Sequence, residues 1–152
     1  MPLGKQKENS GAAAWVAAID IYTRKGFASI IQGERSPGNV LDATRPLWTN
    51  ETVKEIGCDQ DTAFTTNGAF ALAVRNEAGA SVRFKPVRGS VNDLAVVDRF
   101  ISEIKSRLFR SMRDQDTGGR WVDLLPVKVK NYNEKTSLKH RQLFGFKICT
   151  QR

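Results

Sequence analysis

The amino-acid sequence predicts one domain of the α/β class. Its 152 residues are 40% hydrophobic and include three Trp and eight Phe, enough for one buried core but not for two separate domains. Segments with the β-branched content or two-residue alternation of strands are interspersed with segments that have the spacing of helices. The chain is therefore expected to combine strands and helices around a single core.

The N-terminal half begins with two expected strands. Residues Trp15–Tyr22 are apolar apart from one carboxylate and include two isoleucines, which is typical of a buried strand. Residues Phe27–Ile31 follow after Gly26, so the two segments are expected to form a hairpin. The apolar residues between Val40 and Trp48 then fall at helical spacing, although Pro46 interrupts them.

The segment Asn67–Gly79 fits two structures. Asn67-Gly68 is a hairpin signal, and the apolar residues that follow alternate as in a strand. The same segment is rich in Ala and ends in Gly79, as a helix with a glycine cap does. Composition leaves both open. Residues Ala80–Pro86 alternate more clearly and are expected to form a strand.

The longest periodic element covers Ser90–Arg113. Ser90 can cap the helix, with Asp93 in the capping-box position. Apolar residues recur along one stripe, and basic residues gather on or near the opposite face. The stripe consists of Leu94, Val97, Ile101, Ile104, Leu108 and Met112. The basic face is either a solvated helix surface or a binding surface.

The C-terminal part contains one more expected helix. Apolar residues recur at helical intervals over Trp121–Tyr132, although Val127–Lys130 also alternates as a strand would. Residues 134–152 are basic and polar and are expected to form a tail. Residues 1–12 are expected to form a polar arm, which leaves residues 13–133 as the folded domain.

Charge and composition limit the function classes. The net charge of +8 favours a polyanionic partner such as DNA, although a merely soluble basic protein would have the same composition. No apolar run approaches the roughly 20 residues of a membrane span. Two Cys and one His are too few for a disulfide framework or a His/Cys zinc module. An intracellular, nuclear location is expected.

Two carboxylates stand where a phosphoryl-transfer site would need them. Asp59 directly follows the short apolar stretch Ile56–Cys58, and Asp98 lies on the expected helix Ser90–Arg113. Polynucleotidyl transferases assemble two-metal sites from one acid at the end of a strand and another on a helix.

Four segments resemble, in order, the catalytic core of retroviral and retrotransposon integrases, including the Polinton (Maverick) type. The matching segments are 15–25, 59–65, 92–108 and 120–133. The resemblance implies an RNase H-like fold, a mixed sheet with helices on both faces. It also implies that Asn67–Ala78 and Trp121–Tyr132 are helices and that Ala80–Pro86 is a strand.

The resemblance also implies a site. Asp59 matches the family's second catalytic acid and Asp98 the third, which is normally Glu. In an active enzyme they would hold Mg²⁺ or Mn²⁺ through carboxylate oxygens. Lys105, two helical turns beyond Asp98, matches a base that the family presents to DNA. Because the family dimerises through this domain, a homodimer is expected.

Three departures from the family pattern bear on activity. The family's first catalytic Asp lies on a strand before Trp15, and no carboxylate stands at the matching place; Asp20 matches an acidic position that is not catalytic. Asp98 is one methylene shorter than Glu, and Asp61 replaces a Gly. We therefore expect a catalytically degenerate core, as in a domesticated transposable-element integrase, that binds DNA. The alternatives are an active metal-dependent DNA strand transferase and a structural subunit of a nucleoprotein assembly.

Overall fold

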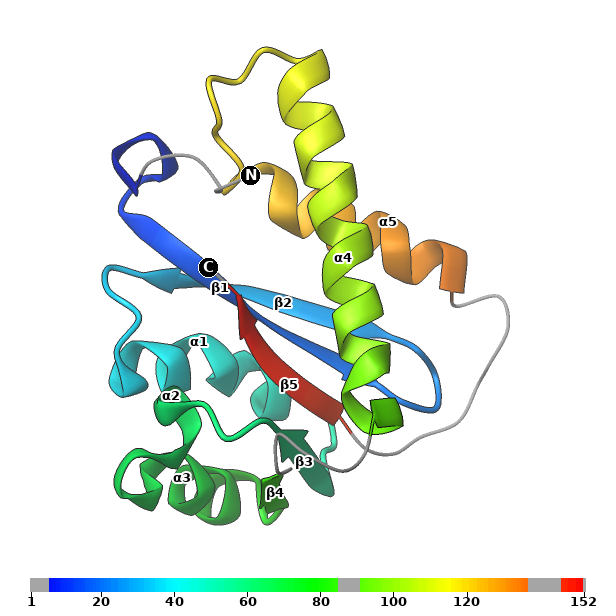
Figure 1. Ribbon diagram of the computed structural model, residues 1–152. Coiled ribbons are helices and arrows are strands. Elements are labelled where there is room, and N and C mark those ends of the chain that lie inside the picture. Colours follow the sequence, from blue (N-terminus) through cyan, green and yellow to red (C-terminus); the bar gives the residue numbers. More distant parts are fainter. Residues whose placement is uncertain (1–5, 85–90, 137–145, 152) are drawn as a thin grey trace.

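The computed structural model describes residues 6–84, 91–136 and 146–151 (Figure 1). These residues form a mixed α/β domain, as the sequence predicts. The strands are β1 (Ala12–Asp20), β2 (Gly26–Gln32), β3 (Glu55–Cys58), β4 (Ser81–Phe84) and β5 (Phe146–Gln151). The α-helices are α1 (Pro37–Asn50), α2 (Thr62–Thr65), α3 (Ala69–Ala78), α4 (Val91–Asp114) and α5 (Leu124–Thr136), and two 3₁₀ turns are η1 (Gln6–Asn9) and η2 (Thr66–Gly68).

The five strands form one sheet in the order β2-β1-β5-β3-β4. Strand β1 runs antiparallel to both of its neighbours, whereas β5, β3 and β4 are parallel to one another. The central strand is therefore β5, the last element of the chain. Its register places Cys149 opposite Ala17 of β1 and Ile148 opposite Cys58 of β3.

This arrangement differs from the basic tail expected for residues 134–152. Helix α5 continues to Thr136, and the backbone of Phe146–Gln151 pairs on both of its sides. The difference has a simple physical reason. A six-residue strand carries little periodicity of its own, and its pairing with residues more than 80 positions away cannot be read from local sequence.

Strand β1 separates two apolar layers. Because successive side chains point to opposite faces of a strand, Ala14, Val16 and Ala18 pack with α1, α2 and α3. Trp15 and Ile19 lie on the other face with α4 and α5. Figure 1 shows α4 and α5 on one side of the sheet and α1, α2 and α3 on the other. The sheet is thus covered by helices on both faces.

The local predictions are largely confirmed. The β1–β2 hairpin, the helix around Pro46, the strand β4 and the long helix α4 all form. The ambiguous segment is helical from Ala69 onward. Asn67 and Gly68 both have positive φ, 54° and 65°, so the turn signal is real but leads into a helix, which Gly79 ends at φ 63°. The expected cap Ser90 lies outside the described residues.

The N-terminal residues include an anchor instead of only an arm. Asn9, at the end of η1, is completely buried, and β1 already begins at Ala12. The Oδ1 atom of Asn9 accepts hydrogen bonds from the backbone N–H groups of Trp121 (2.8 Å) and Val122 (3.3 Å). This side chain fixes the connection that leads into α5. Local sequence gives no signal for it, because its partners are more than 100 residues away.

Candidate functional site

The loop after β3 carries the first predicted acid. The apolar side chains of Ile56 and Cys58 are fully buried, and the half-buried Asp59 follows directly at the end of the strand. Since Cys58 is level with Ile148 of β5, Asp59 follows at the level of Cys149. The sequence of β5 contains no Asp or Glu, so this strand has no carboxylate that could bind a metal together with Asp59.

The side chain of Asp61 makes structural contacts on both of its carboxylate oxygens. Its Oδ1 atom accepts a hydrogen bond from the backbone N–H of Ala63 (2.9 Å), which caps α2, and its Oδ2 atom pairs with the guanidinium of Arg35. Its φ of −62° is ordinary extended backbone, so this position does not need the glycine found in the family. The extra negative charge beside Asp59 is therefore balanced by a cation.

Aromatic side chains hold this loop against α1 and α3. The ring of Phe64 on α2 contacts that of Phe70 edge-on, with centroids 4.9 Å apart, and Phe70 contacts Trp48 at 5.9 Å. Such edge-to-face pairs stabilise by about 1 kcal/mol beyond the burial of the rings. The position of the loop thus depends on the packing of α1 against α3.

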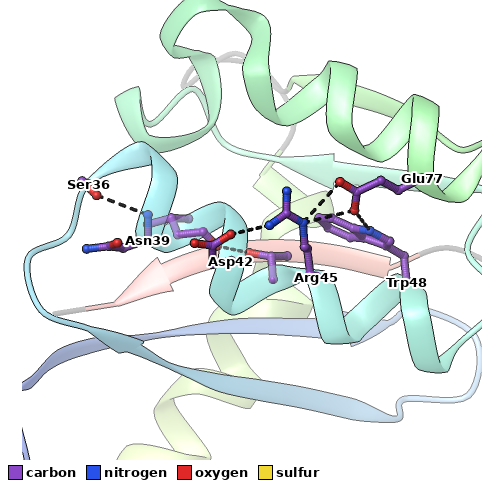
Figure 2. A network of polar contacts seen from close by, with 8 residues as sticks. Ser36, Asn39, Asp42, Arg45, Trp48 and Glu77 are labelled. Atoms are coloured by element: carbon purple, nitrogen blue, oxygen red, sulfur yellow. Dashed lines mark hydrogen bonds and ion pairs between the residues drawn. The ribbon is translucent and has the colours of Figure 1, made fainter.

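A polar network joins the same two helices (Figure 2). Glu77 on α3 accepts hydrogen bonds from the indole Nε1 of Trp48 (2.9 Å) and from Nε of Arg45 (3.2 Å), both on α1. Arg45 also pairs with Asp42 one turn earlier. The hydrogen bond from Trp48, followed by the contacts with Arg45, lowers the pKa of Glu77, so the carboxylate stays ionised at neutral pH.

Helix α4 carries the other two predicted site residues. Asp98 is exposed and Lys105 is half-buried. Seven residues correspond to about 700° of helix rotation, so both lie along one side of α4. The residues that face the sheet are Val97, Phe100, Ile101, Ile104, Leu108 and Met112, all buried. The helix is confirmed, while the catalytic role of Asp59 and Asp98 and the DNA contact of Lys105 stay predictions.

Potential metal ligands are not clustered in the part of the chain that the structure describes. Within segments 6–84, 91–136 and 146–151, no group of three or more Asp, Glu, His or Cys side chains is arranged to hold a metal ion. Asp59 and Asp98 alone supply two carboxylates, fewer than the three that the integrase resemblance requires.

The side chain of Asp20 stabilises the β1–β2 turn. The residue is buried, and its Oδ1 atom accepts a hydrogen bond from the N–H of Tyr22 (3.0 Å) while Oδ2 accepts one from the hydroxyl of Thr23 (2.5 Å). The turn is closed by backbone hydrogen bonds from Asp20 to Lys25 and from Arg24, at φ 61°, back to Asp20. These contacts give the carboxylate a structural role.

Two hollows flank α5. The larger, with a volume of about 870 Å³, lies between β2, the end of α1 and α5, and Phe27, Pro46 and Val129 are among its apolar lining. The smaller, of about 600 Å³, lies between α4 and α5 and is lined by polar and basic side chains. The sequence pattern predicts the basic residues on α4, but it does not show that basic residues of α5 lie next to them.

No protein-family model and no curated protein matches this chain. In the part of the chain that the structure describes, no helix combines the length and the apolar character needed to cross a membrane.

Proposed function

We propose that this chain is an integrase-core-like domain with an RNase H-like architecture that binds duplex DNA and has lost strand transfer. The main observation in support is which strand lies at the centre of the sheet and which side chains it has. The place beside β1 and β3 is taken by β5, which has no carboxylate. The domain thus combines an integrase-like order of segments with a central strand that supplies no carboxylate.

The sheet supports the architectural part of the proposal. An antiparallel hairpin is followed by parallel strands that helices connect, and helices cover both faces. The segment that resembles the loop of the second catalytic acid follows β3, and the segment that resembles the helix of the third lies on α4. These are the kinds of element that the resemblance assigns to them.

The position of β5 supports the loss of catalysis. The resemblance places the first catalytic Asp on a strand that precedes β1, and strands adjacent in sequence usually pair in space. That strand would lie on the side of β1 away from β2. Here β5 pairs along this side over Trp15–Asp20. Because β5 has no carboxylate and Asp98 is shorter than Glu, we propose no metal-dependent step.

The charge supports DNA binding. The chain carries 24 Lys and Arg against 16 Asp and Glu. Phosphate contacts need only correctly placed cations, and they contribute most of the affinity in sequence-independent binding. Such binding would survive the loss of a metal site. Self-association into a homodimer, or assembly with DNA and other proteins, is compatible with the proposal.

Metal titration tests the loss of catalysis. We expect calorimetry with Mg²⁺ or Mn²⁺ to show no saturable site of millimolar or tighter affinity, and Asp59→Asn to give the same heats as wild type. Asp116→Asn is the matched control, since it removes an exposed carboxylate at φ 47°, a conformation that Asn also tolerates. A saturable site that is lost in Asp59→Asn and kept in Asp116→Asn would instead favour an active strand transferase.

A further inference from the structure

A basic groove lies between α4 and α5. Figure 1 shows these two helices on the side of the sheet opposite α1–α3. It is lined by Arg107, Arg110 and Ser111 from α4 and by Lys128, Asn131 and Lys135 from α5. Four cations thus come from two helices that are separate in sequence.

The groove has a net positive charge. Its one lining carboxylate, Glu134, lies 3.9 Å from Lys130, so that charge is already partly balanced. Among the described residues, no carboxylate lies within ion-pair distance of Arg110, Lys128 or Lys135. These three side chains are therefore available to an external anion.

The two helices that form the groove are held together by side-chain contacts. The Phe100 and Tyr132 rings pack edge-on with centroids 4.8 Å apart, which joins α4 to α5. The guanidinium of Arg107 lies 5.9 Å from the centre of the Tyr132 ring and also pairs with Glu103, so this cation is held in place. Burial, with a further contribution from Glu103, raises the pKa of Tyr132, so its phenol stays neutral beside Arg107.

The lining favours a phosphate backbone over unstacked bases. Four cations with one hydroxyl and one amide offer hydrogen-bond donors, and none of the lining residues is aromatic. Proteins that hold single strands depend on aromatic stacking platforms, whereas duplex binding needs cations that track the backbone. We propose that the α4–α5 groove binds the phosphate backbone of duplex DNA.

This surface is distinct from the one that the integrase resemblance implies. Arg107 lies two residues beyond Lys105, about 200° further around α4, and is therefore on the other side of the helix. The inference rests on the proposed DNA-binding function and adds a second contact surface to it. A duplex that uses both surfaces would have to pass around α4, or two duplexes would have to bind.

The test compares salt dependence of duplex binding in matched variants. Arg110→Gln/Lys128→Gln removes two groove cations, Lys105→Gln removes one on the other side of α4, and Arg75→Gln removes an exposed cation of α3 across the sheet. All are measured by fluorescence anisotropy with a labelled duplex, after circular dichroism has shown wild-type folding. Each lost phosphate contact should reduce the slope of log K against log salt by about 0.9.

We expect the groove variant to lose about 2 from this slope, so that between 50 and 200 mM salt its affinity falls about tenfold less than that of wild type. Arg75→Gln should match wild type. Equal slopes for wild type and the groove variant, with a change only in Lys105→Gln, would overturn the groove assignment and leave the proposed function standing. If wild type shows no salt-sensitive binding to the duplex, both the groove assignment and the proposed DNA-binding function are overturned. If wild type binds poly-glutamate and not the duplex, the groove is assigned to an acidic protein.

Discussion

Ile148→Pro is expected to destabilise the protein strongly. Ile148 lies on β5, which pairs with β1 on one side and β3 on the other. Proline removes a backbone donor and its ring disturbs the neighbouring strand, so it is tolerated almost only at sheet edges. At the centre of the sheet the loss should be about 3 kcal/mol or more, a large part of the 5–15 kcal/mol that a domain of this size has.

Urea unfolding followed by circular dichroism measures the effect. Gln32→Pro is the control, because Gln32 is exposed and ends the edge strand β2. It should shift the midpoint much less than Ile148→Pro does. If Ile148→Pro unfolds at the wild-type midpoint, residues 146–151 do not form the central strand. The proposed loss of catalysis then loses the support that it takes from β5.

Gly26→Ala is expected to destabilise the domain by about 3 kcal/mol, at the upper end of the usual effect of overpacking. A Cβ atom on Gly26 would lie 2.3 Å from Cε2 and 2.5 Å from Cζ of the buried Phe100. Phe100 has little freedom to move, since it packs edge-on against Tyr132. Movement of Gly26 itself would disturb its two hydrogen bonds with the Asn133 side chain, at 2.7 and 2.8 Å.

Thermal or urea unfolding of a double-mutant cycle tests this cause. Gly38→Ala is the control, because no atom lies within 4 Å of its added Cβ and its φ is not positive; it should be neutral or slightly stabilising. Phe100→Leu should relieve part of the Gly26→Ala defect, so that the double variant is more stable than the sum of the single changes predicts. Strict additivity would show that the contact with Phe100 is not the cause.

Local sequence predicts the elements whose signals are local. The hairpin has a clear apolar strand signal and α4 has clear helical periodicity, and Asp59 was expected at the end of a short strand, where it lies. The segment after Asn67 could not be assigned from composition alone, because its turn signal and its helix signal are both present in the structure.

The contacts that local sequence could not predict join distant residues. The central place of β5, the burial of Asn9 and the pairing of Asp61 with Arg35 all depend on how the chain packs. The sequence pattern predicts the basic face of α4. That this face lies beside Lys128 and Lys135 follows only from the packing of α4 on α5. Spacing predicts faces of single elements, whereas sites form between elements.

The most direct test of a DNA-binding, non-catalytic core is the affinity of the wild-type chain for duplex DNA across a salt series, with Mg²⁺ and with EDTA. We predict that this binding weakens linearly on a log–log plot, loses most of its strength between about 50 and 200 mM salt, and is the same in EDTA. No binding at the lowest salt, or binding that requires Mg²⁺ and disappears in Asp59→Asn, would contradict it.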